Sequence, residues 1–266
     1  MLIRGVTRRR FLSLSAAALG GVLLRPRRAR AIGEGAKVQF GQVVLGQAWN
    51  PRPSALRRLA WEVDKRTSID IKLEASEVRL SDGDLYKHPM LVLAGDRAFD
   101  APSEEEVTRL RHHLQFGGFL LTDSAEGRPS GRFDASVRAL CARLFPKEPL
   151  GPVDPEHVVY KSFYLLRGAP GRVVATDKLE GLSHDGRLVV VHSQNDLGGA
   201  WARNGFGQWE YDCFPGGEGQ REMAFRVGIN LVMYALCLDY KSDQVHVPFI
   251  MKRRRWKPDD GASSPK

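Results

Sequence analysis

The sequence predicts an α/β fold: a three-layer α/β/α sandwich in which a mainly parallel sheet lies between two layers of helices. Strand-like and helix-like segments alternate through residues 37–145, at the spacing typical of βαβ units. Residues 89–94 and 119–122 are nearly continuous apolar runs, which are typical of parallel strands covered on both faces. A content of 42% hydrophobic and 27% charged residues is ordinary for a globular domain of this length.

Three elements are predicted in the first part of this domain. Residues 38–45 are predicted to form the first strand. Pro53 favours the start of a helix, because apolar residues follow it at the i, i+3, i+4 and i+7 spacing of one helical face. Over residues 69–73, apolar and polar residues alternate, which predicts a half-buried strand.

The helix expected over residues 104–116 has a clear start signal. Ser103 and Glu106 have the spacing of a capping box, and three acidic residues lie where the positive end of the helix dipole is expected. Two glycines then end the helix. His112 and His113, near its end, are expected to face solvent.

The middle of the chain is less regular. Asp134 is expected to cap the next helix. Residues 146–186 contain short β-like runs, at 158–166 and 172–175, between turn residues. Asp185-Gly186 is typical of a two-residue hairpin turn.

The last part of the domain is predicted to hold one more buried strand and a long helix. The strand covers residues 188–191, and a glycine-rich loop is expected over 197–220. The helix carries apolar residues from Phe225 onward, and its apolar run is too short to cross a bilayer.

The basic residues are concentrated outside the predicted domain. The formal net charge is +9, and the first 31 residues contain eight arginines and no acidic residue, so the remainder has 32 basic and 31 acidic side chains. A second basic cluster lies at 252–257, inside a tail at 241–266 that is expected to be partly disordered. Because a nucleic-acid-binding domain usually carries its basic surface on the folded part, nucleic acid is not an expected partner.

Residues 1–31 have the features of a twin-arginine signal peptide. Residues 7–12 resemble the twin-arginine consensus, and an apolar run at 11–24 follows. As a helix this run rises about 21 Å, short of a hydrocarbon core of about 30 Å. The small residues that a signal peptidase reads precede position 32. We therefore expect twin-arginine export to the periplasm, with membrane contact only through this segment before cleavage; an uncleaved anchor is the alternative.

The three cysteines are too few and too widely spaced for a disulfide framework. Cys141 and Cys237 fall in apolar helical patterns and are expected in the core, whereas Cys213 lies in a glycine- and proline-rich loop and is expected to be exposed. Neither C-x-x-C nor H-E-x-x-H occurs, so the sequence predicts no metal site and no cofactor.

Four segments follow one another as in a known bacterial family. They are GGFLLTD at 117–123, His157 with Phe163-Tyr164, GRLVV at 186–190 running into NDL at 195–197 and Trp201, and GINLVMYAL at 228–236. The chain therefore resembles DUF4159, a domain of unknown function, over about residues 37–240.

This resemblance implies a fold similar to that of the class I glutamine amidotransferases, a flavodoxin-like sandwich, without an established activity. It also implies partners, because relatives are encoded beside MoxR-type ATPases and von Willebrand factor A-type proteins of the cell envelope. An active amidotransferase has a nucleophilic cysteine on a strand-to-helix elbow, where this sequence has Asp123 and Ser124. The resemblance thus implies the fold without that chemistry.

Polar residues that follow predicted strands are the candidate site, because ligands of open α/β sheets bind beyond the carboxyl ends of the strands. Asp123, Asn195 and Asp196 are the leading candidates for binding a ligand, and Tyr164 and Trp201 are candidates for an aromatic lining. Capping of helices and Asx turns remain the structural alternative for these polar residues.

Asp123 and Asp196 are expected at the same edge of the sheet, where two carboxylates repel each other unless a partner relieves them. We expect an ion pair with an arginine, for which Arg97 and Arg187 are candidates. An oxygen-lined cation site is the alternative.

Catalysis is the weaker expectation. Ser124 is a possible nucleophile only if His157 or His192 lies close enough to act as its base. The favoured function is therefore a non-catalytic binding or scaffold domain in a cell-envelope complex. The alternative is a hydrolase-like enzyme acting on a small polar or saccharide-like substrate.

Overall fold

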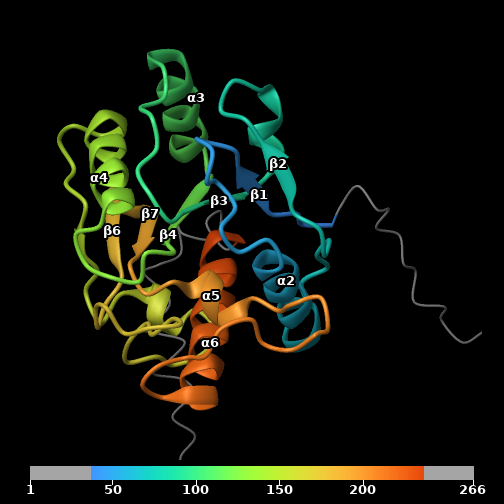
Figure 1. Ribbon diagram of the computed structural model, residues 1–266. Helices are drawn as coiled ribbons and strands as arrows, with labels where there is room; N and C mark the ends of the chain where they lie inside the picture. Colours follow the sequence, from blue (N-terminus) through green and yellow to red (C-terminus); the bar gives the residue numbers. More distant parts are fainter. Residues whose placement is uncertain (1–36, 237–266) are drawn as a thin grey trace, which may run out of the picture. The chain divides into compact units, whose positions relative to one another are not determined.

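A seven-stranded sheet organises the computed structural model, which describes residues 37–236 (Figure 1). Its strands are β1 (Gly41–Val43), β2 (Ser76–Val78), β3 (Met90–Gly95), β4 (Phe119–Ser124), β5 (Gly151–Pro152), β6 (Glu180–His184) and β7 (Arg187–Ser193). They lie in the order β2-β1-β3-β4-β7-β6-β5. Five neighbouring strands, β2, β1, β3, β4 and β7, are parallel to one another. Strands β6 and β5 extend the sheet beyond β7 as an antiparallel edge. The parallel strands alone have the flavodoxin-like order.

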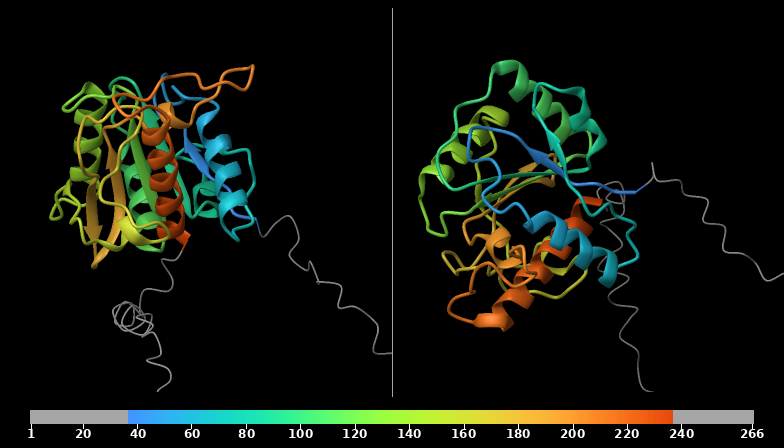
Figure 2. Two further views of the ribbon diagram at one scale, coloured as in Figure 1. Left: turned by 90° about the horizontal axis from the view of Figure 1, so that it is seen from below. Right: turned by 45° about the vertical axis from the view of Figure 1, so that its right-hand side comes forward.

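Helices cover both faces of this sheet, as the right-hand view of Figure 2 shows. The helices are α2 (Ala55–Arg66), α3 (Glu104–Gln115), α4 (Arg132–Leu144), α5 (Leu197–Trp201) and α6 (Gly217–Leu236), with short 3-10 helices η3 (Gly83–Lys87) and η4 (Val158–Lys161). One face is covered by α2, α5 and α6, and the other by α3 and α4. The predicted α/β sandwich with a mainly parallel sheet is confirmed.

Each face has its own buried core. Leu59, Leu121 and Ile229 belong to the core under α2, α5 and α6, and Leu110 and Val137 belong to the core under α3 and α4. Such continuous apolar burial on both faces explains why the central strands show no alternation in sequence.

Helix α6 passes very close to α2 and α5 at Gly228. A Cβ atom there would lie 2.6 Å from Leu59 Cδ1 and 2.7 Å from Trp201 Cζ2. Only glycine fits this approach, because real Cβ atoms do not come so near. The close approach fixes α6 against α5, the short helix that leads out of the candidate site.

The predicted capping box of α3 is confirmed, and the cap of α4 is corrected. Ser103 Oγ accepts a hydrogen bond from Glu106 N at 3.2 Å, and Glu106 Oε2 accepts one from Ser103 N at 2.8 Å. At α4 the expected cap, Asp134, lies inside the first turn. Glu126 instead accepts from the N–H groups of Arg132 and Phe133, because the loop before the helix brings its carboxylate to them.

Two predicted strands are shorter or displaced. The strand expected over 38–45 extends only over β1, and residues 69–73 contribute a single bridge between Val38 and Ile71. Pairing with β1 begins again only at Ser76. Between Ile71 and Ser76 the chain leaves the sheet, and Leu73 in this segment is partly exposed.

The β-like runs at 158–166 and 172–175 do not form strands. The first run begins with η4 and continues as a loop, and the second is a loop; buried amides hold both loops in place. Asn230 of α6 accepts hydrogen bonds from Phe163 N and Tyr164 N, and Asn195 accepts from Ala175 N and Thr176 N. These bonds connect residues far apart in the chain, so no local pattern predicts them.

The hairpin turn at Asp185-Gly186 is confirmed. Both residues have positive φ, 49° and 74°, and they join β6 to β7. The loop expected over 197–220 is corrected, because it contains α5 and the first turn of α6.

Several single residues lie where the sequence did not place them. Cys213 is buried, with 5% exposure, and so is His113, with 4%, although both were expected to be exposed. Cys141 lies in the core and His112 is exposed, as expected. Cys237 lies outside the described residues, as do the predicted signal peptide and the basic tail.

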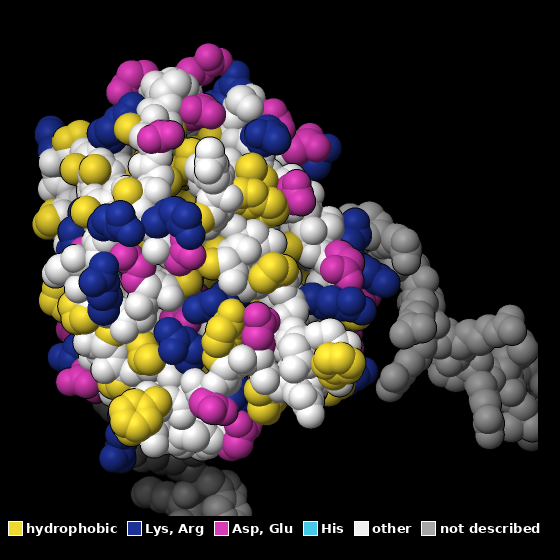
Figure 3. Space-filling model, in the orientation of Figure 1, with side chains coloured by type: hydrophobic (Ala, Val, Ile, Leu, Met, Phe, Trp, Pro, Cys, Tyr) yellow, Lys and Arg dark blue, Asp and Glu magenta, His cyan; other side chains and the backbone are white. Residues whose placement is uncertain are grey.

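Basic and acidic side chains are interspersed over the face drawn in Figure 3. Within residues 37–236, no helix combines the length and the apolar character that crossing a membrane requires.

Candidate functional site

The carboxyl edge of the sheet contains a topological switch point between β1 and β3. The chain leaves β1 toward α2 on one face and leaves β3 toward α3 on the other, and this divergence opens the crevice in which doubly wound folds bind ligands. Here the crevice retains a cavity of about 20 Å³, lined by Gln42, Arg52, Asp123 and Trp201 among others. That volume is room for a single water molecule.

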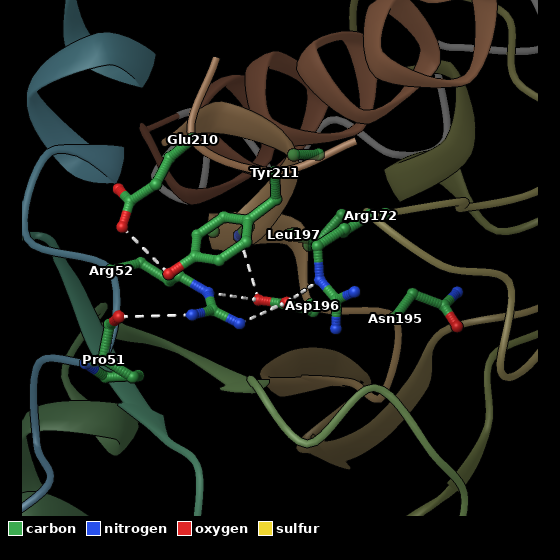
Figure 4. Close-up of polar contacts among 12 residues, drawn as sticks. Pro51, Arg52, Arg172, Asn195, Asp196, Leu197, Glu210 and Tyr211 are labelled. Carbon is green, nitrogen blue, oxygen red and sulfur yellow. Dashed lines mark hydrogen bonds and ion pairs between the residues drawn. The ribbon is translucent and has the colours of Figure 1, made fainter. Parts of the chain in front are cut away.

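Arg52 and Arg172 close this edge by binding one carboxylate, that of Asp196 (Figure 4). Arg52 donates from Nε to Oδ1 at 3.1 Å and from Nη2 to Oδ2 at 2.7 Å, a bidentate pair. Arg172 donates from Nε to Oδ2. We call these three residues the Asp196 clamp.

Aromatic packing completes the clamp. The ring centroid of Tyr211 lies 4.1 Å from Arg52 Cζ and 5.9 Å from Arg172 Cζ, and its hydroxyl donates to Glu210 Oε1 at 2.9 Å. Figure 4 shows the tyrosine ring next to the Arg52 guanidinium, with Arg172 on the other side of Asp196. A guanidinium group next to an aromatic ring in this way makes a cation–π contact.

The backbone of Asp196 is also specialised. Its φ is 54°, in the left-handed region that aspartate tolerates better than most residues. In that conformation its Oδ1 accepts from Gly199 N at 2.9 Å and caps α5. A Cβ atom at Gly199 would lie 2.4 Å from Asp196 Oδ2, so the capping carboxylate requires a glycine there.

Asp123, at the end of β4, binds the first N–H groups of α5. Its Oδ1 accepts from Leu197 N at 3.0 Å and its Oδ2 from Gly198 N at 2.7 Å. Burial raises the pKa of this carboxyl, and the nearby charge of Asp196 raises it further, while the two N–H groups and Ser193 oppose the rise. The two carboxylates therefore lie at one edge, as expected, and both begin the same helix.

The arginines proposed from the sequence as ion-pair partners are wrong. Arg97 pairs with the neighbouring Asp96 at 2.7 Å on an exposed loop. Arg187 donates to the carbonyl oxygens of Gly118 and Leu114, at the opposite end of the sheet. The expectation of an arginine partner is right, but the wrong arginines were chosen.

The sequence indicates the position near the site for only one of the two clamp arginines. Arg52 follows β1 and precedes Pro53, so the rule for carboxyl edges of strands places it near the site. Arg172 lies in an irregular segment, where no local pattern indicates its position.

Asn195 is fully engaged in holding the loop at 169–176. Its Nδ2 donates to Ala169 O and Thr176 O, both at 2.8 Å. Its Oδ1 accepts from Ala175 N at 2.8 Å and from Thr176 N at 2.9 Å. These four bonds use the whole hydrogen-bonding capacity of the amide, so its role in this structure is to position the loop that carries Arg172.

The catalytic candidates do not converge. Ser124 Oγ is buried and has no hydrogen-bond partner among residues 37–236. His192 Nδ1 lies 2.8 Å from Thr122 Oγ1 and its Nε2 lies 3.2 Å from Asp134 Oδ1, so both nitrogens are occupied. A serine nucleophile needs a base within hydrogen-bond reach.

His157 lies at the other end of the sheet. It caps η4, and its ring packs on Tyr234 with centroids 5.6 Å apart. The Tyr234 hydroxyl accepts from Leu188 N, at the beginning of β7, whereas Ser124 ends β4.

The two aromatic candidates are also apart. Trp201 is 1% exposed and belongs to the core under α6, and it lines the small cavity together with Asp123. Tyr164 is half-buried beside α6, with Arg226 Cζ 5.1 Å from its ring centroid. They do not form one aromatic lining.

A second polar cluster, which the sequence did not indicate, lies on the α4 side. Asp134, Glu180 and His192 each offer a possible ligand atom within 4.8 Å of the others. Arg138 Nη2 lies 3.0 Å from Asp134 Oδ1 and 2.6 Å from Glu180 Oε2. The guanidinium therefore supplies the positive charge that a metal ion would bring. The hydrogen bond from His192 and the bonds and charge of Arg138 lower the pKa of Asp134, and they outweigh burial, which opposes the shift.

Comparison with known proteins identifies one family. The model of the family described as "Domain of unknown function (DUF4159)" matches residues 35–236, which include every strand and helix described above. No curated protein matches the chain. The resemblance that the four sequence segments indicated is thus confirmed for the family.

Proposed function

Because the chain belongs to the DUF4159 family, whose name assigns no activity, we propose its function from the geometry: a non-catalytic binding or scaffold domain that is exported and acts in a cell-envelope complex. In this proposal the domain has a fold similar to that of the class I glutamine amidotransferases but does not catalyse their reaction. What it requires is a rigid domain whose recognition surface lies outside the usual crevice.

The filled crevice at the switch point is the observation that carries the proposal. Pockets that bind small molecules usually measure about 300–1,000 Å³. The crevice between β1 and β3 holds about 20 Å³, because Arg52 and Trp201 occupy it. A substrate has no space where enzymes of this architecture bind theirs.

The state of the polar residues supports the same role. A catalytic site needs a nucleophile or an acid–base pair in mutual reach and in contact with substrate. Asp123 and Asp196 are occupied by backbone N–H groups and arginines, and His192 is occupied by Thr122 and Asp134. These contacts favour a structural role for the edge over a hydrolytic one.

Export and partners are supported by the sequence. The arginines at 8–9 and the apolar run at 11–24 favour the twin-arginine pathway to the periplasm. The family resemblance favours MoxR-type ATPases and von Willebrand factor A-type envelope proteins as partners. No contact with nucleic acid is proposed, because the basic excess lies outside the folded domain.

Two measurements test the proposal. Crosslinking of a C-terminally tagged chain in its own bacterium should enrich envelope proteins of those two classes. The matched control replaces Arg8 and Arg9 with lysine, which keeps the charge; this variant should remain in the cytoplasm and lose those partners.

The catalytic alternative has its own test. Full-length protein should turn over no p-nitrophenyl ester or glycoside. Turnover that Ser124→Ala abolishes, while the exposed control Ser81→Ala leaves it intact, would refute a non-catalytic function.

A further inference from the structure

An open groove lies between α2 and the hairpin formed by residues 203–209. It has a volume of about 500 Å³, within the range of small-molecule sites. Arg57, Arg58 and Trp61 line it from α2, and Arg203 lines it from the hairpin. On the right of the face drawn in Figure 3, basic side chains lie beside hydrophobic ones over α2 and the adjoining loop. We call this space the α2 groove.

The two walls of the groove are fixed to each other. Ser54 Oγ accepts from Arg203 N and donates to Arg203 O, both at 2.8 Å. In the hairpin, Asn204 Oδ1 accepts from Phe206 N and Gln208 N, both at 3.0 Å. The groove is therefore a built feature rather than a gap beside a loose loop.

The groove carries an unbalanced positive charge. Arg57 pairs with Glu74 at 3.1 Å, and Arg58 pairs with Glu62. Arg203 pairs with no carboxylate among residues 37–236, and its Nε is buried without a hydrogen-bond acceptor. An anion in the groove would balance the charge of this guanidinium.

Aromatic rings hold two of the arginines in place. Arg203 Cζ lies 4.0 Å from the Trp209 ring centroid, and Arg58 Cζ lies 4.1 Å from that of Trp61. Arg58 Nε is also buried without a partner. Burial lowers the pKa of Arg58, and the like charge of Arg203 lowers it further. The two cations thus repel each other across the groove.

We propose that the α2 groove binds an organic anion, whose carboxylate or phosphate group pairs with Arg203 and Arg57 and whose apolar part lies against Trp61. A guanidinium donates through a planar fork that matches both headgroups, so either can be the anionic group. The remaining apolar lining, Leu73 and the exposed face of Trp61, suits a ring or a short hydrocarbon. This inference goes beyond the proposed function and does not depend on it.

Calorimetry on the full-length chain with three matched probes tests the ligand class. Benzoate or phenyl phosphate should bind with a dissociation constant of about 1 mM or tighter. Benzamide has the same ring without the charge and should bind at least about tenfold more weakly, because it cannot form charge-assisted hydrogen bonds. The tighter of the two anions identifies the headgroup.

Variants test the place of binding. Arg57→Gln and Arg203→Gln should each raise the dissociation constant of the anion about tenfold, the expected effect of losing one charge-assisted hydrogen bond. Arg57 is suited to this because its side chain is 65% exposed, so the variant retains the fold. Arg109→Gln on α3 removes the same charge and an exposed pair with Glu105, and it should leave binding unchanged.

Three results would each overturn the proposal. The first is that neither anion binds the wild-type chain, and the second is that benzamide binds as tightly as benzoate. The third is that Arg57→Gln and Arg203→Gln bind with wild-type affinity. None of these results bears on export or on envelope partners, so the two proposals fail separately.

Discussion

Replacing Asp196 with asparagine tests whether the clamp holds the carboxyl edge together by charge. Asparagine adopts the left-handed conformation as readily as aspartate, so the φ of 54° is retained. Its side-chain oxygen can still accept from Gly199 N. The variant therefore removes one negative charge from between Arg52 and Arg172 and leaves the cap of α5 in place.

The expected loss of stability is large for a single substitution. Breaking a buried ion pair by removing one partner costs about 3–5 kcal/mol. The carboxylate of Asp196 is fully buried, but the side chains of Arg52 and Arg172 are 15% and 25% exposed and can regain some water. We therefore expect the lower end, about 3 kcal/mol. For a domain of this size that corresponds to a fall in Tm of about 6–12 °C.

Urea unfolding of the full-length chain, followed by far-ultraviolet circular dichroism, measures this loss. The matched control is Asp84→Asn, which breaks an exposed pair with Lys87 and should leave the midpoint nearly unchanged. An unaltered m-value would show that the variant changes stability rather than the extent of unfolding. A loss below about 1 kcal/mol would refute the reasoning, because that is the cost of a solvated surface pair.

The same variant should alter the titration of Asp123. The pKa of this carboxyl is raised above its ordinary value of 3.8, first by burial and then by the charge of Asp196. A carboxyl with a raised pKa contributes stability below its unfolded pKa and loses that contribution as the pH rises through its folded pKa. Removing the charge of Asp196 should therefore lower the pKa of Asp123, which carboxyl-carbon NMR measures directly. An unchanged or higher pKa would contradict the coupling.

Three further predictions concern cations, pH and thiols. Calcium or magnesium should not raise the Tm, because the clamp arginines already balance the carboxylates; an increase that Asp123→Ala abolishes would instead indicate a cation site. Burial lowers the pKa of His113 to about 4, so the free energy of unfolding should fall as the pH decreases below 6.5. Between pH 7 and pH 5, the free energy of unfolding of His113→Leu should fall by about 2 kcal/mol less than that of the wild-type chain. His112→Leu, an exposed control, should titrate like wild type in urea unfolding. Burial raises the pKa of Cys141 to about 12 and also raises that of Cys213, so peptide mapping after native iodoacetamide treatment should find neither alkylated.

The elements that the sequence predicts well are those specified by neighbouring residues. Strands β3 and β4 are apolar throughout, because residues from both faces of a parallel strand are buried. The capping box of α3 needs only Ser103 and Glu106, three positions apart. Such signals depend on no contact with a distant part of the chain.

The errors occur where long-range contacts decide the conformation. Helix α5 contains two glycines and has little intrinsic tendency to form. It forms because Asp123, 74 positions earlier than Leu197, accepts its first N–H group. Arg172 reaches Asp196 from a loop that Asn195 holds in place by hydrogen bonds. His113 differs, because it lies three positions after Leu110, a buried residue of the same helical face, so its burial could have been predicted.

One segment of the chain connects the clamp to the α2 groove. Arg52 binds Asp196, Ser54 binds both backbone groups of Arg203, and Arg57 lines the groove one turn further along. Asp196 and Arg203 are in turn joined through α5. The buried charges at the sheet edge therefore set the position of exposed arginines on α2 and the hairpin.

Because both of its walls are held in this way, the α2 groove is preorganised, which lowers the entropic cost of binding a ligand there. A filled sheet edge and a rigid basic groove beside it support the proposed binding role. Calorimetry with benzoate should therefore give a weaker affinity for Asp196→Asn than for the wild-type chain, although Asp196 does not line the groove. An unchanged affinity would contradict this coupling.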